Sequence, residues 1–412
     1  MATLSFDGEP NENMKNAHCG RALSPIMILV ITVFIDITGY GIIIPLLPFY
    51  TSQFQAGPTA LGVLLASFAF MQFLFAPILG KASDNLGRKP ILLLSLLISF
   101  IGFTIFSFSD SYLMLLLSRI IAGLATERAV AQAYIADITD KETRTKELGK
   151  IGAALGAGFI IGPALGGILS VYGYSIPGYI AMILTGINVA FVFAFLKESR
   201  REKTPQEKPG KSYLGELGNS IKKPLIGPTL FILFIVTFAF STIPVVVPLL
   251  SIDYFNFSSL ELSYIFIYIG LIQIFMQGFL IGKISKRFGE EKLIAAGSII
   301  MAVGTFLMPI FRNLAAFYLT NAALAAGVGL TNTAIPAFLS KRASSNEQGS
   351  VLGVASSVTS ISNIPGPLFA GLIYDLAGSI APFAISAAFL TAAFAIGFKV
   401  YQLNAGTVRL ST

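Results

Sequence analysis

Cysteine and histidine are almost absent from this chain, and tryptophan is missing altogether. The single Cys (Cys19) and the single His (His18) both precede the first long apolar run. One Cys cannot form a disulfide within the chain, and a metal site built from Cys and His is excluded. A Ser–His–Asp triad in the apolar part is excluded as well. Without Trp, an aromatic belt at a membrane interface has to use Tyr, such as Tyr50, Tyr112 and Tyr254.

Charge is also scarce. Only 12% of the 412 residues are charged, whereas 54% are hydrophobic. A soluble fold of this length could not bury so much apolar surface, so the sequence predicts a protein that sits in lipid. Because no long polar stretch exists, an enzyme with a large soluble domain is excluded. The Gly80-Lys81 and Gly282-Lys283 pairs lack the other residues of a Walker motif, and no segment resembles a channel filter, so neither an ATPase nor an ion channel is predicted.

Twelve apolar runs are long enough to cross about 30 Å of hydrocarbon. They are expected over 25–47, 59–81, 89–109, 112–136, 147–171, 176–196, 225–250, 260–282, 291–310, 313–339, 347–374 and 379–402. The sequence therefore predicts an all-α membrane protein with twelve transmembrane helices. Its expected parts are a tail (1–24), a six-helix bundle (25–196), a polar and basic linker (197–224), a second six-helix bundle (225–402) and a second tail (403–412).

The positions of Lys and Arg predict the orientation. If both termini face the cytoplasm, 25 of the 28 basic residues lie in cytoplasmic segments and only Arg312 lies outside. The remaining two, Arg119 and Arg128, lie within the span 112–136. This bias predicts cytoplasmic termini. It also explains the net charge of +7 as a topology signal, so nucleic-acid binding is not expected.

The chain contains an internal repeat. GKASDNLGRKP (80–90) matches GKISKRFGEEK (282–292), and Pro45 in the first span matches Pro248 in the seventh. The Gly-Pro pair at 162–163 matches the pair at 366–367 in the same way. One offset of about 200 residues predicts two six-helix halves of equal orientation. Two such halves around a central cavity are a transporter architecture.

Four segments carry a family resemblance. They are LVITVFIDITGYGIIIPLLPFY in the first span, the G-x-x-x-D-x-x-G-R-K pattern at 80–89, LLLSRIIAG in the fourth span and GAALGAGFIIGPALGG in the fifth. With these motifs the chain resembles the major facilitator superfamily, specifically its twelve-helix drug/proton antiporters, and most nearly the tetracycline-efflux type. The resemblance implies a monomeric exporter of small organic compounds in the cell membrane, driven by the proton gradient and without a cofactor.

Four ionisable residues fall well inside the apolar spans: Asp36, Arg119, Glu127 and Arg128. Charge at such depth is costly and marks ion pathways and proton relays. A carboxyl group kept away from water suits reversible binding of a proton, so Asp36 is predicted to carry the coupling proton. Glu127 and Arg128 are predicted to take part as well: if Arg128 reaches Asp36 or another helix, Glu127 is the free acid, available to a proton or to a cationic substrate. The resemblance implies that Arg119 faces Asp36 and influences its protonation. The alternatives are a permanent Asp36–Arg pair, a structural role for Arg119, and a local Glu127–Arg128 ion pair without a transport role.

The loop at 80–90 is predicted to be a conformational lock. Its residues are Gly80, Asp84, Gly87, Arg88 and Lys89, with Asp137 at the end of the fourth span. By resemblance, Asp84 faces the N-terminus of the eleventh helix, Arg88 pairs with Asp137, and these contacts hold the outward-facing state. The alternative is that Arg88 and Lys89 serve only topology. The second copy has Lys286, Glu290 and Glu291 instead, so its lock is reversed or absent.

Two further sets of residues are candidates. Gly158, Gly162, Pro163, Gly166 and Gly167 form the Gly-Pro motif associated with antiporters, although close helix packing alone explains them. By analogy helices 1, 4, 7 and 10 line the cavity, and the candidate substrate contacts, for which simple packing is the alternative, are Tyr40, Gln72, Gln132, Phe240, Gln273, Asn321 and Asn332.

Other functions on the same fold stay open. One is a facilitator, or a proton-coupled transporter of a sugar, organic acid or metabolite. Another is a membrane sensor that no longer transports. Proton-dependent flux separates the three functions, because a facilitator ignores pH and a sensor shows no flux.

Overall fold

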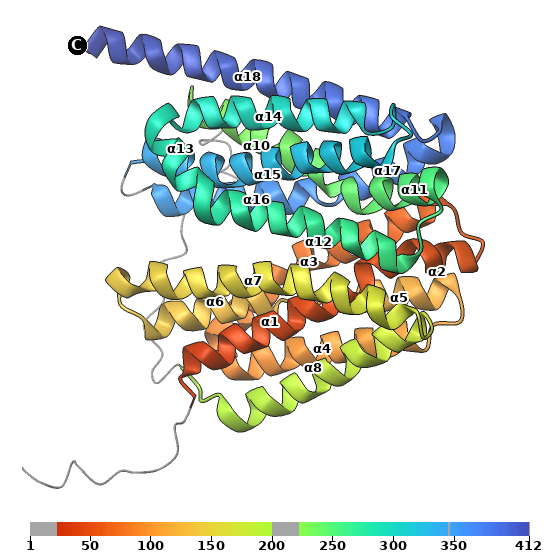
Figure 1. Ribbon diagram of the computed structural model, residues 1–412. Helices are drawn as coiled ribbons and strands as arrows, with labels where there is room; N and C mark the ends of the chain where they lie inside the picture. The colour runs from red at the N-terminus through yellow and green to blue at the C-terminus, as the bar shows by residue number, and fades with distance from the viewer. Residues whose placement is uncertain (1–22, 200–221, 345–346, 412) are drawn as a thin grey trace, which may run out of the picture.

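The computed structural model describes residues 23–199, 222–344 and 347–411, and the regular elements in these ranges are helices packed side by side (Figure 1). His18, Cys19 and most of the predicted linker lie outside the described residues. The last helix continues to Ser411, beyond the end at 402 expected from hydropathy.

Six spans form the first half. Their elements are α1 (Pro25–Ile43), η2 (Ile44–Leu46), α2 (Leu47–Gln53), α3 (Pro58–Leu86), α4 (Arg88–Ser107), α5 (Tyr112–Gly123), α6 (Glu127–Ile138), α7 (Lys141–Ser170) and α8 (Ser175–Phe195). Six more form the second half. They are α10 (Ile226–Ser241), α11 (Ile243–Phe255), α12 (Ser259–Phe275), η3 (Met276–Leu280), α13 (Ile281–Phe288), α14 (Glu290–Leu307), α15 (Leu314–Arg342), α16 (Gln348–Ser362), α17 (Pro365–Ala377) and α18 (Ala381–Ser411).

Nine helical stretches of the described residues are long and apolar enough to span a membrane. The other three of the twelve expected spans have identifiable reasons for falling outside that group. The span 112–136 is divided into α5 and α6, and the span 347–374 is divided into α16 and α17. The ninth, α14, is only 18 residues long and begins with Glu290 and Glu291. The fold class predicted from the sequence is therefore confirmed.

Most interruptions have a local cause in proline. The 3₁₀ turn η2 contains Pro45, and α16 ends just before Pro365. Proline lacks a backbone N–H and disfavours helical geometry at the residue before it. The break between α5 and α6 contains no proline, and the hydropathy pattern predicted a single span there.

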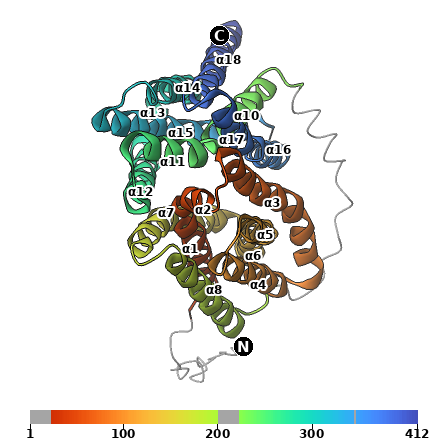
Figure 2. The same ribbon diagram turned by 90° about the vertical axis from the view of Figure 1, so that its right-hand side faces the viewer.

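Figure 2 looks along the helices and shows two groups, α1–α8 and α10–α18, which correspond to the repeats in the sequence. We call the end of the bundle where α1 begins and α18 finishes the terminal end (Figure 1). The opposite end is the distal end.

The two halves are in close contact at the distal end. The N-terminus of α3 meets the C-terminal part of α17, where Asp375 accepts hydrogen bonds from the backbone N–H and the hydroxyl of Thr59. A Cβ added at Gly62 or Gly371 would overlap the backbone of the other helix. The second contact is between α7 and α12, where the Ser170 and Ser259 hydroxyls lie 2.6 Å apart. Small residues thus let the halves approach to backbone contact here.

The terminal end is open between the halves. A Cβ added at Gly80, Gly149, Gly152, Gly282 or Gly349 would meet nothing within 4 Å. The buried apolar residues follow the same division. One large cluster joins the second half to the distal part of the first, whereas a separate cluster fills the terminal part of the first half. The structure is therefore closed at the distal end and open at the terminal end.

Candidate functional site

The break in the fourth span places a carboxyl group at a buried helix N-terminus. Thr126 leaves helical geometry (φ −142°, ψ 43°), and Glu127 is the first residue of α6. The side chain of Glu127 is only 4% exposed, and its Oε1 accepts a hydrogen bond from the Ser99 hydroxyl at 2.7 Å. The unpaired N–H groups at a helix N-terminus favour a negative charge. Glu127 is thus held in one orientation, inside the first half.

Asp36 lies on α1, which packs against α6. It is half-buried, and its carboxyl group interacts electrostatically with that of Glu127. Among the described residues no Lys or Arg forms an ion pair with Asp36. The permanent Asp36–Arg pair considered from the sequence is therefore not formed in this conformation.

Arg119 lies deep in α5, with 2% of its surface exposed. Its guanidinium packs over the Phe106 ring at 5.2 Å, and Nε donates to the Ser118 hydroxyl at 3.3 Å. On the α1 side it interacts electrostatically with the Tyr40 hydroxyl, one turn beyond Asp36. One terminal nitrogen of Arg119 is buried without a hydrogen-bond partner. A buried guanidinium with an unused donor has capacity for another group.

Arg128 follows Glu127 directly but lies on the exposed face of α6. Adjacent side chains on a helix point about 100° apart, which separates the two. Within the described residues no ion pair joins them. The buried acid and the exposed base therefore face different surroundings.

The glycines of the predicted antiporter motif line one face of α7. Gly158, Gly162 and Gly166 pack against α1, and a Cβ at Gly162 would come within 2.7 Å of Gly41 Cα. Pro163 lies inside the continuous helix α7, with its ring against Gly41. Gly167 instead faces Leu260 and Ser263 of α12. One short segment thus contacts both the helix that carries Asp36 and the other half of the molecule.

The loop predicted to be a lock forms an ion-pair cluster at the terminal end. Arg88 pairs with Asp84 and with Asp137 at 2.7 Å each, and also donates to the Ser83 hydroxyl. Its side chain is only 10% exposed. Gly87 has φ +105°, a conformation in which other residues are strained. Among the described residues the Asp84 carboxylate is bonded to Arg88 and not to α16 (Gln348–Ser362), so its predicted contact with the eleventh helix is not made in this conformation.

Two functional partners were missed by sequence reasoning. The carboxylate of Glu198, at the start of the linker, accepts the backbone N–H groups of Arg88 and Lys89. Lys89 Nζ in turn donates to the Phe193 carbonyl at 2.9 Å. Ser99 was missed as the partner of Glu127, because Ser is common in apolar spans and nothing in its spacing points to α6.

The candidate substrate contacts lie in different surroundings. Tyr40 is half-buried and stacks on Phe68 with ring centroids 5.0 Å apart. Gln132, Phe240 and Gln273 are half-buried, whereas Gln72 and Asn332 are exposed. Asn321 is fully buried, and its amide donates to the Phe317 carbonyl at 2.9 Å. Asn321 is therefore enclosed by helix packing in this conformation.

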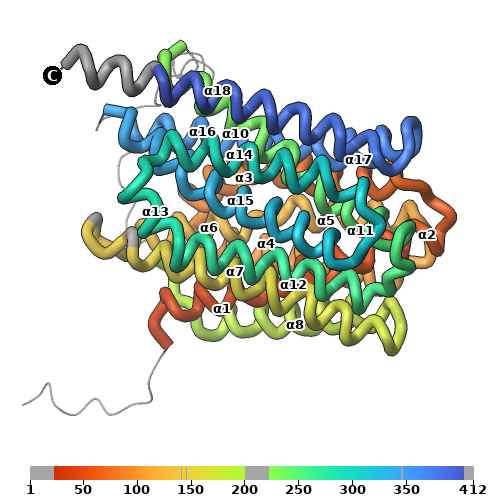
Figure 3. The backbone as a smooth tube through the Cα atoms, turned by 45° about the horizontal axis from the view of Figure 1, so that its top comes forward, coloured from red at the N-terminus to blue at the C-terminus, as the bar shows by residue number. Residues whose placement is uncertain are grey.

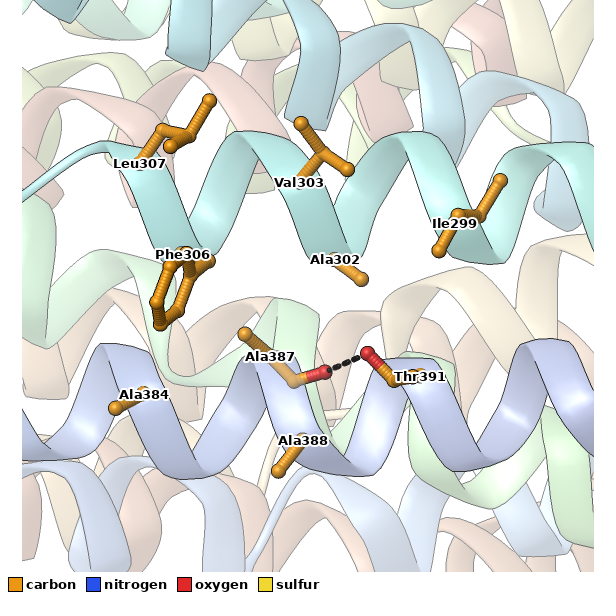
Figure 4. Close-up of a pocket in the computed structure, with 9 residues that line it drawn as sticks. All are labelled: Ile299, Ala302, Val303, Phe306, Leu307, Ala384, Ala387, Ala388 and Thr391. Carbon is orange, nitrogen blue, oxygen red and sulfur yellow. Dashed lines mark hydrogen bonds between the residues drawn. The ribbon is translucent and has the colours of Figure 1, made fainter.

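A pocket of about 360 Å³ lies elsewhere, between α14 and α18 (Figure 4). Its lining is apolar, and the hydroxyl of Thr391 is already bonded to the Ala387 carbonyl at 2.8 Å. None of the four intramembrane ionisable residues lines it. Among the described residues there is also no group of three His, Cys, Asp or Glu side chains that could hold a metal.

Comparisons with known proteins agree with this architecture. The family model described as Major Facilitator Superfamily matches residues 29–289 and 229–409. The chain belongs to the Major Facilitator Superfamily. It is an integral membrane transporter and not an enzyme.

Curated members of the superfamily are similar along most of the chain. The class H tetracycline resistance protein of Pasteurella multocida is 34% identical over 365 residues, which cover 85% of this chain and 89% of that protein. Multidrug resistance protein 2 of Bacillus subtilis (strain 168) is 30% identical over 356 residues, covering 85% of this chain and 88% of that protein. Among solved superfamily structures, the nucleoside transporter NupG aligns with a TM-score of 0.75 at 15% identity, over 92% of this chain and 99% of that one.

Proposed function

We propose that this member of the superfamily is a proton-coupled exporter of small amphipathic organic compounds or drugs that works by alternating access. The observation that carries the proposal is that two acids inside the spans, half-buried Asp36 and buried Glu127, lie on α1 and α6, which pack against each other, and interact electrostatically. In a low-dielectric setting, mutual repulsion opposes ionisation of both groups at once. The pair is thus suited to hold a proton in one conformation and to release it in another.

Arg119 supports this role by position. It is buried beside Tyr40 on the helix that carries Asp36, and it keeps an unused donor. A cation held there changes the free energy of ionising Asp36 and Glu127 when the helices move. Arg128, exposed on the next helical position, offers a second cation to an anionic group of a substrate or to the proton path.

Export is supported by the curated relatives, whose names refer to tetracycline and multidrug resistance. Orientation is supported by the concentration of Lys and Arg, from which we infer that the terminal end faces the cytoplasm. A molecule open at that end takes its substrate from the cytoplasm. We place it in the cell membrane, acting as a monomer.

The proposed substrate surface combines aromatic faces and amides. Tyr40, Gln132, Phe240 and Gln273 are half-buried, and Gln72 and Asn332 are exposed, so all six are available to a ligand. Aromatic faces with a few amides suit amphipathic organic molecules. In this proposal the cluster around Arg88 regulates closure of the terminal end, and the glycine face of α7 transmits movement between α1 and α12.

Reconstitution into liposomes tests the function. With an imposed pH gradient, tetracycline, a quaternary ammonium dye and a neutral sugar are offered in turn, and both substrate uptake and internal pH are followed. An exporter exchanges substrate for protons, and collapse of the gradient stops accumulation. Flux that ignores the gradient would identify a facilitator, and no flux with any compound that shifts the melting temperature would identify a sensor.

A further inference from the structure

The cluster around Arg88 has a counterpart in the second half, and its first-half form sets the comparison. Ser83 and Arg88 are hydrogen-bonded at 2.7 Å, and Arg88 reaches Asp137 at the end of α6. Gly87, with φ +105°, separates α3 from α4. Asp84 completes the cluster and is half exposed at 51%. The central charge is therefore positive, and the charges around it are negative.

In the second half every charge of the cluster is reversed. Glu290 accepts a hydrogen bond from Ser285 at 3.3 Å and pairs with Lys341, near the end of α15, at 2.5 Å. Gly289, with φ +79°, separates α13 from α14. At the position equivalent to Asp84 stands Lys286, which is exposed and has no ion-pair partner among the described residues. The second half thus repeats the glycine turn between two helices, and the charges around that turn have the opposite signs.

The eighth span, which consists of α12, η3 and α13 and carries Lys286, runs antiparallel to α7 of the other half (Figure 3). Gly167 on α7 contacts Ser263 on α12, and Gly156 contacts Ile274. Moving eleven residues forward along α12 thus moves the contact eleven residues back along α7. The pairing of the two helices has one regular register over this whole length.

The same register predicts what Lys286 meets when the terminal end closes. Lys286 lies twelve residues beyond Ile274, and the π-helical turn η3 (Met276–Leu280) adds one residue without advancing the helix by a full step. Eleven or twelve residues back from Gly156 are Thr145 and Arg144. Glu142, which is exposed, lies less than one helical turn nearer the start of α7.

The charges at this point are complementary. Asp140 directly precedes α7, its side chain makes no capping hydrogen bond, and Glu142 lies in the first turn. Arg144 is turned back to the carbonyls of Ala136 and Thr139. The exposed acids Asp140 and Glu142 are therefore available to the approaching helix, with Lys146 as the exposed base beside them. Lys286 and Glu142 lie within one helical turn of each other along this register. Their side chains are long enough to meet between the two helices once the helices come together.

We propose that Lys286 and Glu142 form an ion pair between the two halves when the terminal end closes, with Asp140 adding to its field. The pair is a second clamp, opposite in polarity to the one that Asp84 is expected to make with the eleventh helix. It rests on the proposed alternating-access function. In the conformation described here no ion pair joins Lys286 and Glu142.

Charge reversal tests the clamp in the liposome assay. Lys286→Glu or Glu142→Lys alone places like charges together, so maximal export falls about tenfold while the substrate concentration for half-maximal rate is unchanged. The double variant restores the attraction and recovers most of the rate, as does the conservative Lys286→Arg. Lys399→Glu, at an exposed base of α18 away from α7, is the control and keeps its rate. A double variant no better than either single variant overturns the proposal.

A crosslink tests the proximity independently of transport. Lys286→Cys with Glu142→Cys, in a Cys19→Ser background without other thiols, forms a disulfide under mild oxidant, and reductant restores export. No crosslink, with both thiols reactive to maleimide, would overturn the clamp. This failure is distinguishable from failure of the proposed function. Without a clamp, Asp36→Asn still abolishes proton exchange, whereas without proton coupling the crosslink still reports closure.

Discussion

The carboxylate of Glu198 lies at the N-terminus of α4, where its two oxygens accept the backbone N–H groups of Arg88 and Lys89 at 2.9 and 3.1 Å. The start of the linker between the halves is thus fastened to the loop that carries Arg88. The same carboxylate lies 2.7 Å from the position that a Cβ at Gly87 would occupy. A cap of this kind satisfies N–H groups that a helix cannot pair internally.

Replacing Glu198 with Ala removes this cap. We expect a loss of about 1 kcal/mol in stability, the usual effect of losing an N-terminal cap. Thermal unfolding in detergent measures it, and Glu142→Ala, at an exposed position in the first turn of α7 without such a bond, is the control. An unchanged melting temperature for Glu198→Ala would show that the two hydrogen bonds contribute nothing.

Asp36→Asn is expected to lower proton-coupled export about a hundredfold, the scale of losing a positioned proton carrier. Asn keeps the size and polarity of the side chain, so expression and melting temperature stay normal. Substrate-induced pH change in liposomes is the measurement, and Asp110→Asn, at an acid in the loop before α5, is the control. Full activity of Asp36→Asn would end the proposal for Asp36.

Glu127 and Ser99 can be separated by a pair of variants. Glu127→Gln keeps an oxygen to accept the Ser99 hydroxyl but removes the charge, whereas Ser99→Ala keeps the charge and removes a hydrogen bond of about 1 kcal/mol. We expect Glu127→Gln to reduce export of a cationic dye more than export of a neutral compound. Ser99→Ala should shift the pH profile while retaining export. Identical pH profiles and rates for both variants and the parent would assign Glu127 a packing role only.

Gly162→Ala is expected to force α1 and α7 apart. The added Cβ would come within 2.7 Å of both Gly41 Cα and the Thr38 carbonyl oxygen. Overpacking at such a contact costs about 1–3 kcal/mol, so the melting temperature and the export rate both fall. Gly152→Ala on the same helix, where a Cβ meets nothing within 4 Å, is the control for thermal stability.

Arg88→Ala leaves Asp137 and Asp84 without their shared cation. Because Asp137 and Asp84 are 31% and 51% exposed, loss of these ion pairs costs about 1 kcal/mol in stability, and closure of the terminal end should become slower. Turnover is expected to fall more than substrate binding, which stopped-flow export and equilibrium binding measure separately. Asp84→Asn should slow turnover without the stability loss, and an unchanged turnover in both variants would reduce the loop to a topology signal.

The sequence predicts those features that depend on the depth of residues in lipid. Twelve apolar runs locate twelve spans, and the cost of charge inside them singles out Asp36 and Glu127. It does not predict the break before Glu127, because the interruption contains no proline. Gly123, just before the break, packs directly on the backbone of α3 at Phe68, a tertiary contact that the sequence pattern does not reveal.

The rotation of each helix about its own axis is the other feature that the hydropathy pattern does not determine. A helix that is apolar all round gives no sign of which face meets the cavity. This is why Asn321, an amide expected at the cavity, lies enclosed by helix packing, and why Ser99 could not be paired with Glu127. Glu198 escaped prediction because its partner, the start of α4, comes near only after four helices have folded between them.

Closure at Thr59–Asp375 and at Ser170–Ser259 has a pharmacological consequence. If the terminal end faces the cytoplasm, as proposed, a blocker applied outside the cell finds no route to Asp36 while the protein holds this shape, and only molecules that have already crossed the membrane can reach it. Compounds designed against this shape must therefore be permeable, whereas antibodies and other large reagents have to recognise the closed outer surface itself.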